Sequence, residues 1–318
     1  MRAVVVGGGS WGTAFAALLR ERGHEVTLAC RDAAQAAAIA ESGRNPRYLR
    51  GVDLSGIRAA TIESAPIAEA SLVVVAVPSA AFASVVAGLP GTAPLLSLTK
   101  GLDPATGVRL STLVRGRPAA VLSGPNIADE IGRGLPAAAV VACDDAALAL
   151  ELQRAITSPG FRVYVNDDVV GVELCAAAKN VIALAAGAAD GLGLGDNAKA
   201  ALVTRGLAEM GRLAEVAGGR PETFAGLAGM GDLVVTCWSA SGRNRRAGEL
   251  IAQGTAPAQA AAQIGTVVEG LTTAPLLRDL AHRLEVEMPI TEGVCAVLGG
   301  LPLTDLVASL MRREPTAE

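Results

Sequence analysis

Residues 2–12 read R-A-V-V-V-G-G-G-S-W-G, a short β-branched run that leads directly into three glycines with the spacing G-x-G-x-x-G. The glycines are Gly7, Gly9 and Gly12. In a strand–turn–helix unit the first permits a tight turn, the second lets the backbone approach a pyrophosphate, and the third lets the helix pack on the strand. The Ala- and Leu-rich segment 13–22 predicts the helix, whose N-terminal amides would face the phosphates. The first loop is therefore predicted to hold a dinucleotide.

The size and composition of the chain favour a two-domain protein with a large core. Of its 318 residues, 51% are hydrophobic but only 3% are aromatic, which suits Val-rich strands covered by Ala-rich helices. The formal net charge is −4 and no block of Lys and Arg occurs, so we expect no nucleic-acid partner. A small anionic substrate would have to be held by locally placed cations.

The cysteines, histidines and apolar runs argue against several classes of protein. The 5 cysteines are scattered without a C-x-x-C pair, which is typical of reduced thiols in a cytoplasmic protein. With only 2 histidines, we expect no metal site and no His-based triad. The chain starts directly with a predicted strand, so we expect no signal peptide. Charged and polar residues interrupt the apolar stretch 172–187, so no membrane insertion is expected.

Strand and helix patterns alternate in the first half of the chain. We predict a helix at 33–41 and strands at 25–29, 72–77, 95–98, 119–122, 137–142 and 161–165. This alternation predicts an α/β fold, a Rossmann-like doubly wound sheet with its ligand crevice at the carboxyl ends of the strands.

The second half shows helical patterns and almost no strand signal. We predict helices at 172–189, 247–253, 272–284, 291–298 and 304–311, and another that Asp196 caps and that runs to 217. The sequence therefore predicts two domains, a dinucleotide-binding domain at 1–168 and an all-helical substrate and catalytic domain at 169–318.

Lys179 is the most unusual polar residue of the predicted helices. Ala176 and Ala183 lie one helical turn before and after it, so its face of the helix is apolar. A lysine held inside such a face suits proton transfer, whereas a lysine whose stem covers the alanines would reach solvent. The neighbouring Asn180 fits an ordinary polar helix position as well as a functional one.

A second polar segment, G-M-G-D-L-V-V-T-C-W-S-A-S-G-R-N-R-R, spans residues 229–246. Asp232 lies between glycines and an apolar run, which predicts a buried carboxylate near Thr236. Buried carboxylates need partners, and a lysine is the natural one.

The end of the same segment concentrates cations in what we predict to be a glycine-bearing loop. Arg243, Asn244, Arg245 and Arg246 supply donors that suit a phosphate, which arginine binds in bidentate fashion. The alternative is a solvated basic loop.

Two further groups follow predicted strands. Lys100, in L-T-K-G-L, comes after the strand at 95–98, where side chains face the ligand crevice of this architecture. The segment S-G-P-N-I-A at 123–128 turns the chain at the end of the next strand and could open a helix toward a ligand.

The residues after the second strand bear on the choice of cofactor. An NAD-specific site places Asp or Glu there to bond the ribose 2′-hydroxyl. This chain has Arg31, which could accept a 2′-phosphate, followed by Asp32, which would oppose one. Because Arg31 comes first, we favour NADP(H) as a usable cofactor, with NAD(H) as the alternative.

Eight segments carry a pattern that covers nearly the whole chain. They are GGGSWGTAFA (7–16), VAVPS (75–79), TKGL (99–102), SGPNIADE (123–130), VYVNDDVVGVEL (163–174), KNVIALAAGAADGLGLGDNAKAAL (179–202), GMGDLVVTCWSASGRNRR (229–246) and VVEG (267–270). With them the chain resembles the NAD(P)-dependent glycerol-3-phosphate dehydrogenases of the bacterial soluble type. The segments at 179–202 and 229–246 are the specific ones.

The resemblance implies a role for each matching residue. Lys179, the lysine of the K-N-V motif, would be the proton donor and acceptor, with Asp232 orienting it as the second catalytic residue. The implied substrate-binding residues are Lys100, Gly124, Asn126, Asn180, Thr236, Arg243 and Asn244. The implied cofactor-binding residues are Gly7, Gly9, Ser10, Trp11, Gly12, Arg31, Lys100, Ala128, Arg243 and Glu269.

Two departures from the family pattern touch the substrate side. Asn126 stands where Ser or Thr is usual, followed by Ile127 in place of Phe, and Gly242 stands where a Ser commonly precedes the Arg-Asn pair. Asn126 can still donate, whereas Gly242 offers only its backbone amide. We expect altered affinity and the same reaction.

The resemblance implies reversible hydride transfer between NAD(P)H and dihydroxyacetone phosphate, giving sn-glycerol 3-phosphate for phospholipid synthesis. It also implies a homodimer. Two alternatives stay open at this point: a β-hydroxyacid or ketopantoate reductase type of dehydrogenase, and a non-catalytic dinucleotide-binding redox sensor. The first would handle carboxylates and lacks the T-C…R-N segment, and the second would not need Lys179, Asp232 and Arg243 together.

Overall fold

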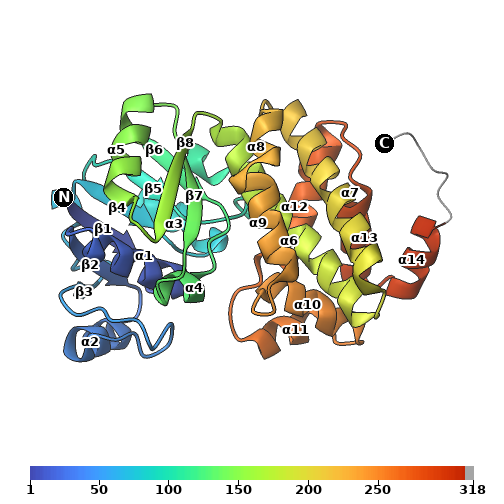
Figure 1. The fold of residues 1–318 in the computed structure, drawn as a ribbon, viewed down its shortest axis with the longest axis horizontal. Coiled ribbons are helices and arrows are strands. Elements are labelled where there is room, and N and C mark those ends of the chain that lie inside the picture. The colour runs from blue at the N-terminus through green and yellow to red at the C-terminus, as the bar shows by residue number, and fades with distance from the viewer. Residues whose placement is uncertain (312–318) are drawn as a thin grey trace. The chain divides into compact units, whose positions relative to one another are not determined.

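The computed structural model describes residues 1–311 and divides the chain into two compact units. Unit 1 comprises residues 1–176 together with 218–232, and unit 2 comprises 177–217 together with the residues from 233 onward. In Figure 1 the strands of unit 1 run from blue to green, and the helices of unit 2 run from yellow-green to red.

Unit 1 is built on one 8-stranded sheet with the order β3-β2-β1-β4-β5-β6-β7-β8. The strands are β1 (Arg2–Val6), β2 (Glu25–Cys30), β3 (Arg58–Thr61), β4 (Leu72–Val75), β5 (Leu95–Ser97), β6 (Ala119–Ser123), β7 (Ala137–Ala142) and β8 (Phe161–Asn166). All neighbouring strands pair in parallel except β6 and β7, which are antiparallel. The doubly wound sheet predicted from the sequence is confirmed, and its strand order reverses beside β1, where such folds bind their ligands.

Helices and turns cover both faces of this sheet. They are α1 (Ser10–Glu21), α2 (Ala33–Ser42), α3 (Ser79–Ala87), α4 (Ala128–Gly132), α5 (Ala146–Ile156), α8 (Pro221–Ala225), the short turns η1 (Ile67–Glu69), η2 (Leu110–Leu113) and η3 (Leu227–Gly231), and the start of α6 (Val169–Gly191).

Alternate residues of the central strands pack into two separate hydrophobic cores, one on each face of the sheet. Val5 and Val74 pack with Phe15 of α1 in the first core, whereas Val4 and Val73 pack on the opposite face, in the core of Phe82 from α3. Because both faces are buried, the strands read as continuous apolar runs instead of alternating patterns. This explains why the central strands could be predicted from the sequence.

Every element that the structure describes in unit 2 is a helix. They are the second part of α6, α7 (Gly195–Val216), α9 (Asp232–Trp238), whose first residue belongs to unit 1, α10 (Arg243–Ala252), α11 (Pro257–Ile264), α12 (Glu269–Arg283), α13 (Pro289–Leu298) and α14 (Leu303–Met311). The predicted helical character of the second half is confirmed.

Two local predictions are wrong. Arg243 to Arg246 form the first turn of α10, where a loop was predicted. Gly242 is the N-cap, so the helix begins directly after it. Asp196 lies in the first turn of α7 and is not its cap, since the helix already begins at Gly195. No element was predicted from the sequence at β3, α3, α5, α8, α9 and α11.

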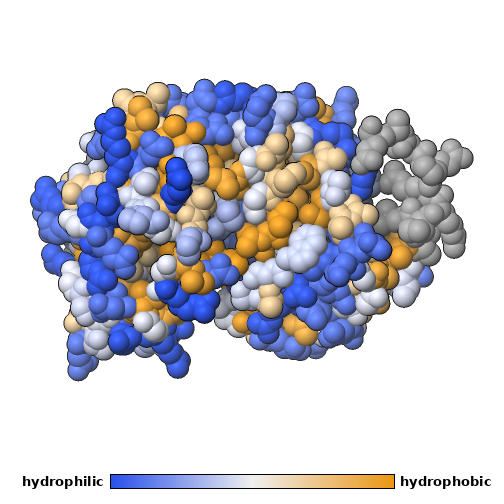
Figure 2. Space-filling view, in the orientation of Figure 1, coloured by the Kyte–Doolittle hydropathy of each residue, from blue (hydrophilic) through white to orange (hydrophobic). Residues whose placement is uncertain are grey.

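Helix α6 is long and apolar enough to cross a membrane by length and composition, but 89% of its apolar window is buried inside the structure. A core helix of a folded domain passes the same test, and this is how α6 is used here. In Figure 2 the visible face carries hydrophilic residues with hydrophobic patches between them.

Helices α6 and α10 approach each other closely through two glycines. A Cβ atom added to Gly248 would lie 1.9 Å from the backbone oxygen of Leu184, and one added to Gly187 would lie 1.8 Å from the backbone oxygen of Arg245. Neither backbone can yield without separating the helices.

We therefore expect Gly248→Ala to lower the free energy of unfolding by about 2 kcal/mol, because the added methyl group overpacks a backbone contact. Thermal unfolding followed by circular dichroism measures this. Gly299→Ala is the matched control in unit 2, since its added Cβ would find ordinary contacts at 3.4 Å. Equal melting of the two variants would contradict the close approach of α6 and α10.

Candidate active site

The glycine-rich loop has the geometry that its spacing predicts. Gly7 has a φ of +118°, and a Cβ there would lie 2.3 Å from the backbone oxygen of Ala76. A Cβ on Gly12 would lie 2.0 Å from the backbone oxygen of Gly7, so only glycine lets α1 come this close to the turn. At Gly9, by contrast, an added Cβ would meet none of the described atoms within 4 Å.

This loop fits the pyrophosphate of a dinucleotide. Gly9 is the N-cap of α1, no described side chain caps the helix, and the space that a Cβ of Gly9 would enter is open. Helix N-termini of this kind attract phosphate. Ser10 begins the helix, and Trp11 packs its ring edge-on against Phe15 at a centroid distance of 5.5 Å. Trp11 can therefore offer its backbone to a cofactor while its ring serves the core.

A buried amide network that the sequence analysis missed fixes the loop from below. Asn45 is fully buried and donates through Nδ2 to the backbone oxygen of Gly8 (3.0 Å) and to Thr13 Oγ1 (2.8 Å). Gln35 of α2 donates to the same oxygen of Gly8 at 2.7 Å. No motif flags such residues, because their roles depend on which carbonyl the fold brings to them.

Lys100 and Asp232 form an ion pair within unit 1. Lys100 Nζ lies 2.5 Å from Asp232 Oδ2 and also donates to the backbone oxygen of Gly124 at 3.1 Å. The Asp232 side chain is 1% exposed, and Ser123 Oγ donates to it at 3.4 Å. The sequence predicted a lysine partner for this carboxylate, and within unit 1 that partner is Lys100.

The turn after β6 contains an amide with unused hydrogen-bonding capacity. Both polar atoms of the Asn126 side chain are buried, and neither has a hydrogen-bond partner among the residues that the structure describes. Buried polar groups are almost always paired, so an orphan of this kind fits a group that a ligand completes. Ala128, another implied contact residue, begins α4 just beyond it.

In unit 2, Lys179 is held inside its helix face. Lys179 is only 6% exposed, and its Nζ donates to Thr236 Oγ1 of α9 at 2.8 Å. Lysine on this apolar face is thus buried and hydrogen-bonded, as the interpretation in terms of proton transfer requires. Thr236 lies one helical turn after Asp232 in α9.

A chain of amides connects three helices of unit 2. Asn244 Nδ2 donates to Asn180 Oδ1 at 2.8 Å, and the backbone N–H of Gly270 donates to Asn244 Oδ1 at 2.9 Å. The Asn244 amide is therefore engaged at both ends. What the first turn of α10 offers to a ligand is its backbone amides and the exposed Arg243, whose Nη1 donates to the backbone oxygen of Val267 at 2.8 Å. Glu269 begins α12 beside this contact.

A buried charge cluster in unit 2 was also missed. Asp190 Oδ2 accepts from Lys199 Nζ at 2.8 Å and from Arg245 Nε at 2.6 Å, and Lys199 is only 4% exposed. The rarity of lysine could have pointed to this cluster, because only three of the 27 Lys and Arg residues are lysines, namely Lys100, Lys179 and Lys199. All three are buried or partly buried and paired, whereas the other cations are arginines.

The thiols near the glycine loop and in α6 are poor nucleophiles. Burial, with a smaller effect of the Asp32 charge, raises the pKa of Cys30 to about 11. Burial, aided by the charges of Asp168 and Asp232, also raises the pKa of Cys175. The structure has all five cysteines as free thiols. Among residues 1–311 no group of three or more His, Cys, Asp or Glu could hold a metal ion.

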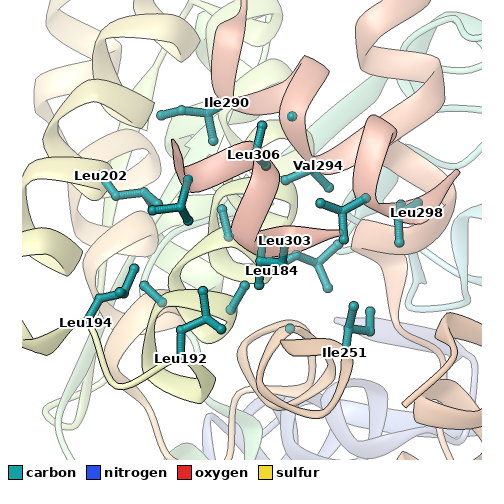
Figure 3. A pocket seen from close by; sticks show the side chains of 17 residues that line it. Leu184, Leu192, Leu194, Leu202, Ile251, Ile290, Val294, Leu298, Leu303 and Leu306 are labelled. Carbon is teal, nitrogen blue, oxygen red and sulfur yellow. The ribbon is translucent and has the colours of Figure 1, made fainter. Parts of the chain in front are cut away.

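Unit 2 also contains an apolar pocket. Figure 3 shows the pocket, which has a volume of about 90 Å³ and lining residues that include Leu184, Leu192, Ile251 and Val294. All 17 lining residues are apolar or glycine, so they provide no side chain for proton transfer or for binding a phosphate.

Comparison with known proteins gives one consistent family. The model of the NAD-dependent glycerol-3-phosphate dehydrogenase N-terminus matches residues 2–149, and that of the C-terminus matches residues 168–308. The glycerol-3-phosphate dehydrogenase (NAD(P)+) of Moorella thermoacetica is 47% identical over 99% of this chain and 96% of its own length. That of Variovorax paradoxus is 48% identical over 100% and 99%.

A solved structure agrees with these sequences. The crystal structure of glycerol-3-phosphate dehydrogenase from Coxiella burnetii has a TM-score of 0.94 and 38% identity, and the match covers 98% of this chain and 99% of that one. These matches favour this family over the β-hydroxyacid and ketopantoate reductases considered from the sequence.

The glycine loop yields a prediction that separates folding from binding. Gly12→Ala should lower the free energy of unfolding by about 2 kcal/mol, since its methyl group collides with the backbone of Gly7. Gly9→Ala should melt like the unmodified chain yet bind NADPH at least roughly tenfold more weakly, because its methyl group enters the space for the pyrophosphate. Calorimetry of unfolding and of NADPH binding measures both. A Gly9→Ala chain with unchanged affinity would contradict the placement of the pyrophosphate.

Proposed function

The chain belongs to the NAD-dependent glycerol-3-phosphate dehydrogenase family, and from this premise we propose that it interconverts dihydroxyacetone phosphate and sn-glycerol 3-phosphate with NAD(P)H. The observation that carries the chemistry is the buried Lys179 of α6, the helix with the K-N-V motif, whose Nζ donates a hydrogen bond to Thr236 of α9. Residues 1–168 would hold the cofactor, and residues 169–318 would supply most of the catalytic groups.

In this proposal Lys179 moves the proton of the reaction. A nicotinamide cofactor held at the glycine loop would supply a hydride to the ketone carbon, and negative charge would then grow on the ketone oxygen. The Lys179 ammonium gives its proton to that oxygen, and in the reverse direction the neutral amine takes the hydroxyl proton. The Thr236 hydroxyl accepts a hydrogen bond from Nζ, which helps to orient the ammonium.

Lys100 and Asp232 would set the charge of the site. Because Asp232 is 1% exposed, its carboxylate needs a compensating cation, and Lys100 supplies one at 2.5 Å. We propose that Asp232 orients the catalytic lysine while Lys100 helps to hold substrate and cofactor. The unpaired amide of Asn126 and the backbone of Gly124 would contribute hydrogen bonds to the substrate.

The phosphate of the substrate would bind at the start of α10. Arg243 is exposed there, and the amide chain through Asn244 and Asn180 fixes the helix end without using its backbone N–H groups. A dianionic phosphate is stabilised by arginine and by the helix N-terminus together. Anchoring the phosphate lets binding energy position the carbonyl.

We also expect the protein to be a cytoplasmic homodimer that supplies glycerol 3-phosphate for phospholipid synthesis. The reduced thiols support the cytoplasmic compartment. The sequence has no block of Lys and Arg, which argues against nucleic-acid partners. Sedimentation analysis of the purified chain would determine its oligomeric state.

Removal of the proton donor tests the mechanism. Lys179→Ala should lower kcat for the reduction of dihydroxyacetone phosphate by about 1,000-fold or more, since it loses general acid catalysis. NADPH binding, measured by calorimetry, should change less than about twofold, because the glycine loop is intact. Turnover at the level of the unmodified chain would rule out Lys179 as the proton donor.

The phosphate assignment has a test with a control in the same turn. Arg243→Ala should raise KM for dihydroxyacetone phosphate by about 10- to 100-fold, as expected for loss of a hydrogen bond from a charged donor. Arg246→Ala removes an exposed arginine three residues further along and should leave KM nearly unchanged. Equal effects of the two substitutions would favour the alternative of a solvated basic segment.

A further inference from the structure

The carboxylate that follows β2 is hydrogen-bonded to groups of the protein itself. Asp32 is the N-cap of α2, and its Oδ1 accepts from the backbone N–H groups of Ala34 at 2.9 Å and Gln35 at 3.4 Å. Its Oδ2 lies 2.6 Å from Nη2 of Arg47. The two amides, with a smaller effect of Arg47, hold the pKa of Asp32 below its usual value. Both oxygens are therefore occupied within the protein, and the negative charge is balanced.

Arg47 is brought to this corner by the same network that fixes the glycine loop. The buried Asn45 accepts through Oδ1 from the backbone N–H groups of Arg47 at 3.0 Å and Tyr48 at 3.2 Å. Its Nδ2 is bonded to the backbone oxygen of Gly8. One side chain thus ties the backbone of Arg47 to the loop that receives the pyrophosphate. The position of Arg47 relative to that loop is set by buried hydrogen bonds.

The charge of the corner favours an anion. The segment 44–50 reads R-N-P-R-Y-L-R and contains no acidic residue. Arg44 and Arg50 donate to backbone oxygens of the segment itself or of Gly51, whereas Arg47 pairs with Asp32 and keeps 59% of its side chain exposed. Arg31, immediately after β2, is also exposed, so the arginines outnumber the carboxylate of Asp32, which Arg47 already pairs.

We propose that Arg47 is a specificity-determining residue that, together with Arg31, binds the 2′-phosphate of NADP(H), and that Asp32 positions Arg47 instead of reading the ribose 2′-hydroxyl. This inference rests on the dinucleotide site of the proposed function and adds to it the group that selects the phosphorylated cofactor. Arginine suits the role because its fork binds phosphate in bidentate fashion while another N–H stays on the carboxylate. The conflict between Arg31 and Asp32 in the sequence is thereby resolved.

The test measures binding without catalysis. Adenosine 2′,5′-bisphosphate and adenosine 5′-monophosphate are titrated by calorimetry into the unmodified chain and into Arg47→Ala. The unmodified chain should prefer the bisphosphate, and Arg47→Ala should bind it about tenfold or more weakly while its affinity for the monophosphate stays within about twofold. Arg50→Ala, in the same segment, is the control and should bind both ligands like the unmodified chain.

A second substitution separates the two roles of Asp32. Asp32→Asn keeps a side chain that can cap α2 and removes the negative charge, so the affinity for the monophosphate should stay within about twofold. If Asp32 read the ribose hydroxyl, this variant would instead bind the monophosphate more weakly. That result, or an Arg47→Ala chain with an unchanged preference between the ligands, would overturn the inference.

The outcome stays separate from that of the proposed function. A chain that shows the predicted ligand preferences yet oxidises neither cofactor would support the 2′-phosphate site and contradict the dehydrogenase activity.

Discussion

The close approach of α1 to the turn after β1 is the constraint on which unit 1 depends. A methyl group at Gly12 would lie 2.0 Å from the oxygen of Gly7, so the helix can leave the central strand at this angle only when the side chain is absent. The next carbonyl, that of Gly8, is then free to accept from Gln35 and Asn45. One steric condition therefore places the helix N-terminus, the buried amides and the segment that carries Arg47.

Unit 2 depends on a different constraint, the need to pair polar groups that the fold buries. Lys179, Asn180 and Asn244 are each between 5% and 8% exposed, and an unpaired polar group at such a depth costs on the order of 1–3 kcal/mol. Each has a partner in a neighbouring helix, so pairing also fixes the direction of each side chain. Close packing of α6 on α10 through Gly187 and Gly248 makes these short contacts possible.

The sequence predicted well what depends on local pattern. The strands buried on both faces, the helical second half and the glycine turn all have signals within a few residues. The pairing of Asp232 with Lys100 was not predicted, because 132 residues separate the two and only the fold brings them together. For the same reason the sequence did not show that residues 218–232 join the first unit, or that β7 runs antiparallel to β6.

Motifs also show residue types but not how their atoms are used. Asn244 was expected to face substrate phosphate, yet its amide is engaged at both ends within unit 2. Asp32 was expected to oppose a 2′-phosphate, yet its charge is taken up by a helix cap and by Arg47. In both cases the deciding fact is a hydrogen bond to a residue outside the motif.

The proposed reaction of this chain is the reduction of a phosphorylated ketone with a nicotinamide cofactor. Its most direct test follows the absorbance of NADPH, and then of NADH, at ~340 nm after the purified chain is mixed with dihydroxyacetone phosphate or with dihydroxyacetone. The two ketones differ by the phosphate, whose binding energy is expected to contribute to the rate. We predict rapid loss of absorbance with dihydroxyacetone phosphate and little loss with dihydroxyacetone. No loss with either cofactor, or equal rates for the two ketones, would contradict it.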